Sequence, residues 1–87
     1  MEPSSFIVEF HPHLSEKDWH NFMLAVGTAG AISHWQSSHR VELTCIRRSR
    51  LQHVGYIVYR TADPSLGKVV GVTGEAQSRA SAYARSA

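Results

Sequence analysis

One segment constrains the fold more than any other, because it predicts a helix with a defined start and one apolar side. Ser15, followed three residues later by Asp18, resembles a capping box, which satisfies free N–H groups at a helix start. Apolar residues then recur at i, i+3, i+4 and i+7, namely at Trp19, Phe22, Met23 and Val26. We expect a helix from about Glu16 to Val26, ended by a left-handed cap at Gly27 or Gly30. Such a helix needs a second layer on which to bury its stripe.

The second layer is predicted by segments in which apolar and polar residues alternate, as they do in strands. The first of these segments stops before Pro12, which has no N–H group for a strand ladder. The predicted strands are residues 6–10, 31–36, 40–46, 54–59 and a last short one at 68–72. The fold class is therefore α+β, with an antiparallel sheet of three to five strands in a βαβββ(β)α order. The first helix packs on one face, and a weak helix ends the chain.

The C-terminal end leaves two alternatives open. Thr73 can cap a final helix over residues 74–85, but its apolar stripe is thin, and the last ten or so residues can equally fray. The outcome decides what happens to the second face of the sheet, which carries Ile7 and Ile57 beside Glu9. That face is either covered by the tail helix or open to a partner, including a second copy in a homodimer.

Length and composition favour a single domain of ordinary globular character. The chain has 87 residues, of which 43% are hydrophobic and 18% charged, and we expect one domain over residues 1–87. Cys45 is the only cysteine, so packing and not an internal disulfide must hold the fold, which agrees with a reducing compartment. The chain start lacks the basic and apolar regions of a secretory signal, and no apolar run approaches the roughly 18 residues of a membrane span. We expect a cytoplasmic protein that does not enter membranes.

The sequence offers no set of residues to which catalytic roles can be assigned. Cys45 has the same strand phase as Val41 and Leu43, which predicts a buried, unreactive thiol. Gly67 and Lys68 precede two valines and do not close a G-K-[ST] phosphate loop. A G-x-S-x-G nucleophile motif is also missing. We therefore expect no enzymatic activity and no cofactor.

Three of the six histidines lie close together in the sequence and are the candidates for a metal site. His11 and His13 point to the same side of an extended segment, and His20 lies on the flank of the predicted helix near Glu16. No C-x-x-C or H-E-x-x-H motif supports the site. The alternative is that these histidines mark a strand-to-helix joint, and we expect that they do not converge on a metal.

The positive charge is concentrated in the middle third of the chain. Arg47, Arg48 and Arg50 lie between two predicted strands, which places them at the tip of an arginine-rich β-hairpin. Arginine, tryptophan and tyrosine are also the usual anchors of protein interfaces. The candidate contact residues are Arg40, Arg47, Arg48, Arg50, Arg60, Trp35, Tyr56 and Tyr59.

These observations lead to two functional hypotheses. The first is a small non-enzymatic binding module that acts by protein–protein contact, as an inhibitor or regulator of a bacterial or phage-related system. The alternative is a nucleic-acid-binding domain in which the arginine-rich tip contacts phosphates and the aromatic residues stack on bases. Three arginines are fewer than the broad basic stripe of most nucleic-acid-binding proteins, which favours the first hypothesis.

Overall fold

The sheet has a strand order that identifies its topology. The computed structural model describes residues 3–77. Its main elements are β1 (Ser4–Phe10), α1 (Glu16–Ala29), β2 (Ala31–Trp35), β3 (Arg40–Cys45), α2 (Leu51–Ile57) and β4 (Gly67–Thr73). The strands form one antiparallel sheet in the order β2-β3-β1-β4. A β-α-β-β-α-β chain with this strand order has the split β-α-β, or ferredoxin-like, topology.

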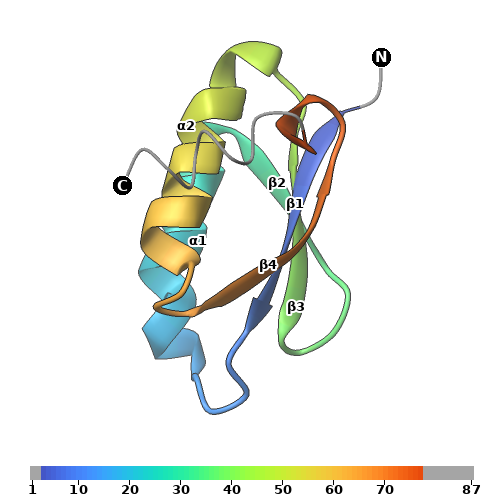
Figure 1. The fold of residues 1–87 in the computed structure, drawn as a ribbon. Coiled ribbons are helices and arrows are strands. Elements are labelled where there is room, and N and C mark those ends of the chain that lie inside the picture. The colour runs from blue at the N-terminus through green and yellow to red at the C-terminus, as the bar shows by residue number, and fades with distance from the viewer. Residues whose placement is uncertain (1–2, 78–87) are drawn as a thin grey trace.

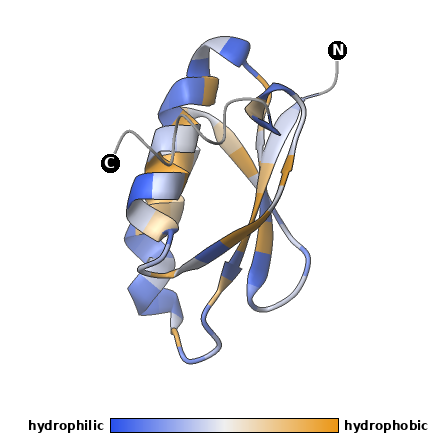
Figure 2. Cartoon of the chain, in the orientation of Figure 1, coloured by the Kyte–Doolittle hydropathy of each residue, from blue (hydrophilic) through white to orange (hydrophobic). Residues whose placement is uncertain are grey.

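The helices cover one face of the sheet, as Figure 1 shows. Hydrophobic residues lie on both the strands and the helices (Figure 2), and those of them that are buried form the core between the two layers. The largest fully buried side chains are Phe6, Val8, Phe10, Phe22, Val26, Val41, Leu43, Leu51, Val54 and Val58. The predicted α+β class, its antiparallel sheet and the packing of the first helix are confirmed. Within residues 3–77, no helix has the length and apolar character needed to cross a membrane.

Helix α1 begins where the capping pattern predicts. The Asp18 carboxylate accepts hydrogen bonds from the Ser15 N–H group at 2.7 Å and from the Ser15 hydroxyl at 3.0 Å. These bonds stabilise the charged form and lower the pKa of Asp18. The helix runs one turn further than predicted and ends at Gly30, which has the left-handed φ of 110°.

Helix α2 corrects one predicted element, because residues 54–59 form helix and not strand. Two shorter helical turns flank α2: η1 (Arg48–Arg50) has 3-10 geometry and η2 (Val58–Ala62) has π-helical geometry. The sheet topology explains why this segment is helical. Strands β3 and β4 are each antiparallel to β1 and hence parallel to one another. Parallel strands need a crossover connection, which is usually a helix. The buried residues of the segment have the helical spacing, at Leu51, Val54, Gly55, Val58 and Ala62.

The second face of the sheet carries no helix within residues 3–77. Residues 75–77 are helical, as predicted for the C-terminal segment, and the rest of that prediction lies outside the described residues. The uncovered face is polar at its centre, where Glu9 on β1 lies beside Arg40 on β3 and Lys68 on β4. It is therefore not the continuous apolar patch that would favour a dimer through this face.

Candidate functional site

The arginine cluster does not lie at a hairpin tip, because the element that follows it is a helix. Arg47 precedes η1, and the Arg50 N–H group donates to the Arg47 carbonyl at 2.9 Å to close this turn. The cluster therefore lies in the β3–α2 connection, where it leads directly into α2. The Arg47 and Arg50 side chains are exposed and form no ion pair with any other residue of the described range 3–77.

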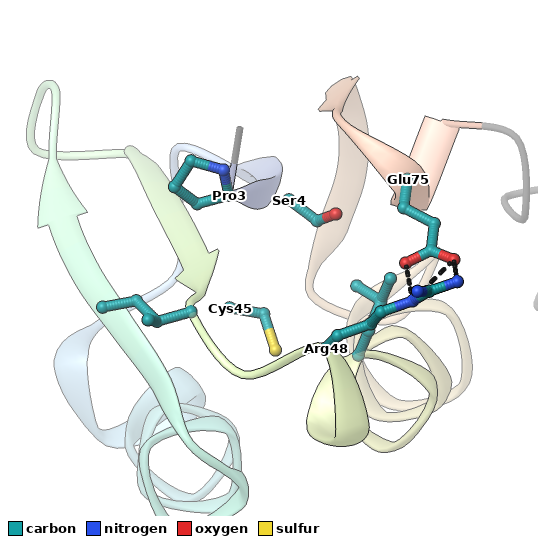
Figure 3. Close-up of a pocket in the computed structure, with 7 residues that line it drawn as sticks. Pro3, Ser4, Cys45, Arg48 and Glu75 are labelled. Atoms are coloured by element: carbon teal, nitrogen blue, oxygen red, sulfur yellow. Dashed lines mark hydrogen bonds and ion pairs between the residues drawn. The ribbon is translucent and has the colours of Figure 1, made fainter. Parts of the chain in front are cut away.

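Arg48, in contrast, is paired with an acidic residue. Its Nε lies 2.9 Å from Glu75 Oε2, and its Nη2 donates to Glu75 Oε1 at 2.9 Å (Figure 3). The pair joins η1 to the segment that follows β4 and lines a small cavity of about 220 Å³. The other lining residues are Pro3, Ser4, Cys45, Ile46 and Leu51. Because its charge is balanced by Glu75, Arg48 is less available to an anionic partner than Arg47 or Arg50.

Cys45 in this cavity is not an activated nucleophile. Burial raises the pKa of the Cys45 thiol, because a charged thiolate is poorly solvated in an apolar environment. The thiol donates a hydrogen bond to the Arg47 carbonyl oxygen at 3.2 Å, as expected for the protonated form. The predicted burial of Cys45 is confirmed.

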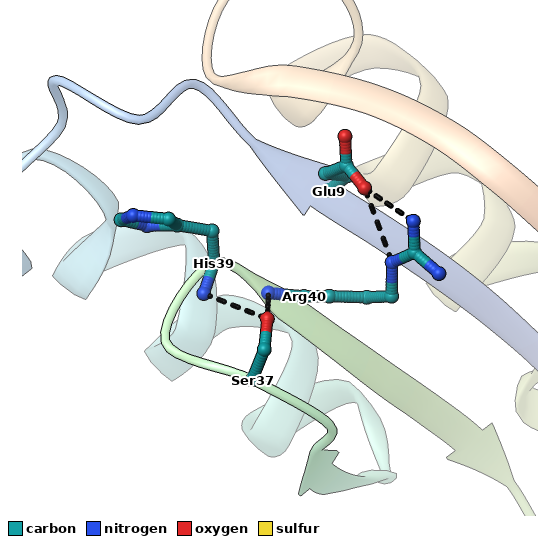
Figure 4. Close-up of polar contacts among 4 residues, drawn as sticks. All are labelled: Glu9, Ser37, His39 and Arg40. Carbon is teal, nitrogen blue, oxygen red and sulfur yellow. Dashed lines mark hydrogen bonds and ion pairs between the residues drawn. The ribbon is translucent and has the colours of Figure 1, made fainter.

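Arg40 lies at the opposite end of β3 from the arginine cluster. Its Nε donates to Glu9 Oε2 at 3.1 Å, and its Nη2 donates to the same oxygen (Figure 4). The hydrogen bond and charge of Arg40 lower the pKa of the Glu9 carboxyl group below its ordinary value. The Ser37 hydroxyl holds the adjoining turn by accepting bonds from the N–H groups of His39 and Arg40. Arg40 thus does not share a surface with the other arginines.

Two of the aromatic candidates pack against the interior. Tyr59 is partly buried, and its ring meets Phe6 edge-on at a centroid distance of 6.1 Å. Trp35 lies on the helix side of the sheet, with its ring centre 5.0 Å from that of Trp19 and 5.9 Å from that of Phe10. The Trp35 side chain keeps 37% of its surface exposed, at the end of the edge strand β2.

The remaining candidates lie, together with His53, on one surface at the outer side of α2 and its flanking turns. We call this the α2 surface, and it consists of Arg47, Arg50, His53, Tyr56 and Arg60. From Arg50 onward these residues follow each other at three or four positions, the spacing of one helix face. The Arg60 guanidinium lies 4.7 Å from the centre of the Tyr56 ring in a cation–π contact. Residues 46–62 contain no aspartate or glutamate, so the charged side chains that this segment contributes are all arginines.

A groove between the two helices adjoins the α2 surface. This interhelical groove has a volume of about 490 Å³. Leu24 on α1 is 56% exposed there, and Ile57 on α2 is partly buried beside it. Arg50 and His53 belong to both the groove and the α2 surface. The lining residues are Leu24, Ala25, Thr28, Ala29, Arg50, His53 and Ile57.

Leu24, His53 and Ile57 are the site residues that the sequence analysis missed. Leu24 gave a usable signal, because it is a large apolar residue outside the stripe that α1 buries. Ile57 gave none, because residues 54–59 are predicted to form a strand, and His53 gave none, because it lies just before that predicted strand. In α2 they are one turn apart on the same side of the helix, and both line the groove.

The histidines near the start of α1 do not converge. The rings of His11 and His13 stack at a centroid distance of 5.6 Å, and His11 Nε2 lies 3.3 Å from the carbonyl oxygen of Pro64. His20 is exposed on α1. No group of three or more histidine, cysteine, aspartate or glutamate side chains within residues 3–77 is arranged to hold a metal ion.

The uncovered face of the sheet lacks the aromatic residues that RNA-recognition domains of this topology use. In those domains, aromatic side chains on the sheet stack on bases. The two central strands, β1 and β3, here present none to the uncovered face. The side chains that β1 and β3 present on that face are those of Ser5, Ile7, Glu9, Arg40, Glu42 and Thr44.

Comparison with known proteins identifies no relative. No protein-family model, curated protein or solved structure matches the chain.

Proposed function

We propose that the chain is a small protein-binding module that holds an acidic, amphipathic helix of its partner. The partner's apolar side would lie in the interhelical groove, against Leu24 and Ile57. Its acidic side would meet the α2 surface, where Arg47 and Arg50 extend into solvent. Helix-in-groove docking of this kind is a common mode of recognition, and it lets a small domain regulate or inhibit a larger protein by occluding part of it.

One observation carries the proposal: an exposed apolar groove is bordered by basic side chains with no acidic residue among them. The acidic residues of α1, Glu16 and Asp18, lie in its first turn. Arg50 lies by the other end of α1, where its Cγ is 3.5 Å from where a Cβ on Gly30 would be. An acidic helix could therefore approach the Arg50 end of the groove without like-charge repulsion.

Binding to nucleic acid is the alternative that uses the same arginines. The acid-free segment 46–62 supports it, because phosphate contacts require only positive charge. The groove and the central strands favour a protein partner. Leu24 and Ile57 have no use in a phosphate contact, and β1 and β3 present no aromatic side chain for base stacking.

The test compares charge and groove variants in the same capture experiment. The immobilised chain is exposed to nuclease-treated bacterial lysate, and captured proteins are identified by mass spectrometry. We expect Arg50→Glu and Leu24→Asp to lose a protein that wild type retains. Lys17→Glu makes the same charge change on an exposed part of α1 outside the groove and should keep that protein. With the purified partner, each of the first two variants should weaken binding by about tenfold or more.

A nucleic-acid arm separates the two hypotheses. Fluorescence anisotropy with mixed oligonucleotides is measured over a salt series, because phosphate contacts make affinity fall steeply with salt. Oligonucleotide binding that Arg50→Glu abolishes, together with no protein lost in the capture experiment, would replace the proposal with the alternative. A captured protein that binds all variants equally would also refute it.

A further inference from the structure

The sheet has two edge strands, β2 and β4, which differ in how far their outward main-chain groups are blocked. An edge strand presents unpaired N–H and C=O groups that can pair with another chain. Natural proteins usually block such edges with charged residues, bulges or covering groups. The comparison of the two edges shows where the chain is open to pairing.

The β4 edge is blocked in three ways. The N–H group of Val69 donates to the Asp63 carboxylate at 3.2 Å, so this donor is already occupied. Lys68 places a charge within the strand. The register between β1 and β4 shifts between Ile7 and Val8, which marks an irregularity that twists the edge.

The β2 edge carries none of these devices. Its five residues include no proline and no acidic or basic residue other than His34. Its pairing with β3 is regular throughout. No side chain within residues 3–77 forms a hydrogen bond with the main chain of β2. Ile32 is 55% exposed and Trp35 keeps part of its ring in solvent.

The main-chain groups that face outward from β2 follow from its pairing with β3. The Gln36 N–H group donates to the Arg40 carbonyl at 2.8 Å, which makes these two residues a hydrogen-bonded pair. Such pairs alternate with non-hydrogen-bonded ones along an antiparallel ladder. Counting back in steps of two, His34 and Ile32 direct their main-chain groups toward β3. Ala31, Ser33 and Trp35 therefore direct theirs outward.

We propose that the β2 edge pairs with the β2 edge of a second copy, antiparallel about a two-fold axis at Ser33. In this register Ser33 faces Ser33 of the second copy, and Ala31 faces Trp35. Every residue with outward main-chain groups then meets another such residue, which allows about six hydrogen bonds at two per pair. The strand is thus complementary to itself, and the two four-stranded sheets become one continuous sheet.

The side chains of β2 also fit this register. Ile32 lies opposite His34 of the second copy on the uncovered face, so this register places no two like-charged side chains opposite each other. On the helix side, Trp35 lies opposite Ala31, whose small side chain leaves room for the exposed part of the indole. Five paired residues bury less than the roughly 1,200 Å² of a stable interface, so the dimer should be reversible with a dissociation constant in the micromolar range.

This inference does not rest on the proposed function. Contacts place α1 next to β2, whereas η2 at the end of α2 contacts β1 and β4. The α2 surface is therefore not used in β2 pairing. A dimer would present two α2 surfaces at once, and failure of one proposal would leave the other unaffected.

The experiment is sedimentation equilibrium of the whole chain from about 1 µM to about 1 mM, which brackets a micromolar dissociation constant. We expect wild type to fit a reversible monomer–dimer equilibrium. Ser33→Pro removes an outward N–H group without removing a bond to β3, and it should remain monomeric. Ser33→Ala keeps that N–H group and should dimerise like wild type. Circular dichroism and thermal melting would establish that both variants fold.

A second pair of variants decides the matter if Ser33→Pro does not fold. Ile32→Lys places a charge on the β2 edge and should weaken dimerisation by about tenfold or more. Val70→Lys places the same charge on the β4 edge and should leave it unchanged. Wild type that is monomeric throughout would refute the proposal. A dimer equally strong in Ile32→Lys and in a folded Ser33→Pro would also refute it.

Discussion

The two edges of one sheet show how the path of the chain decides which surfaces stay open. At β4, the loop after η2 turns back beside the strand, which brings Asp63 to the Val69 N–H group. At β2, no such loop exists within residues 3–77, because α1 ends at Ala29 and β2 begins at Ala31. Because β2 is entered directly from a helix and left through a tight turn, neither connection on either side of it covers its edge. The open edge therefore follows from connection length as much as from composition.

The largest effect is expected for a substitution at Gly67, where the main chain of β4 lies close to that of β1. A Cβ added at Gly67 would lie 2.0 Å from the Glu9 carbonyl oxygen and 2.8 Å from the Phe10 Cα, which are main-chain atoms that cannot swing away. We predict that Gly67→Ala destabilises the fold by about 3 kcal/mol or more. Urea unfolding followed by circular dichroism measures this difference.

Gly27→Ala is the matched control, because it adds the same methyl group where nothing lies within 4 Å. Gly27 is inside α1, so alanine should raise the free energy of unfolding by about 0.5 to 1 kcal/mol. The two substitutions are therefore expected to have opposite signs. A Gly67→Ala variant as stable as wild type would mean that β4 does not approach β1 this closely.

The next largest effect is expected when the hydrogen bond between the Val69 N–H group and the Asp63 carboxylate is removed. Asp63→Ala removes the acceptor of the Val69 N–H group and should lower the free energy of unfolding by about 1 kcal/mol. Hydrogen exchange at Val69 should also become faster, because its amide would face solvent. Asp63→Asn keeps an oxygen that can accept the bond and should preserve much of the protection. Equal exchange rates in wild type and Asp63→Ala would show that the carboxylate does not block this edge.

The sequence predicted the elements whose periodicity and end signals agree. Helix α1 has both a start signal at Ser15 and a glycine stop, and its apolar stripe admits no strand alternative. The segment 54–59 has no such signals. Its valine, isoleucine and tyrosine residues favour strands, and their alternation hid the helical spacing of Val54 and Val58. Only the strand order of the whole sheet, which makes a crossover necessary, resolves this ambiguity.

The candidate site was predictable only in part, for a related reason. The arginines of residues 47–50 are neighbours in the sequence, so their clustering was evident. The interhelical groove joins Leu24 to Ile57, and the β4 edge joins Asp63 to Val69. These contacts between distant segments depend on how the helices pack and how the loops turn. The periodicity of one segment does not predict them. Because residues 54–59 are predicted to form a strand, the α2 side of the groove could not be predicted from the sequence.

The smallest expected effect concerns the ion pair between the two central strands, β1 and β3. Glu9 on β1 is opposite Arg40 on β3 and Lys68 on β4, and its carboxylate forms an ion pair with Arg40. Because Arg40 lowers the pKa of Glu9 in the folded state, the ionised carboxylate contributes stability above its unfolded pKa. This contribution is lost as the pH falls through the lowered folded-state pKa.

Glu9→Gln should therefore be less stable than wild type near neutral pH and equally stable in strong acid. Urea unfolding from about pH 7 to about pH 2 measures the difference, which should be small because the pair is exposed to solvent. Glu42→Gln is the control, since Glu42 lies on the same face without an ion pair among the described residues. If Glu9→Gln and Glu42→Gln show the same pH dependence, the ion pair with Arg40 does not contribute to the stability of the sheet.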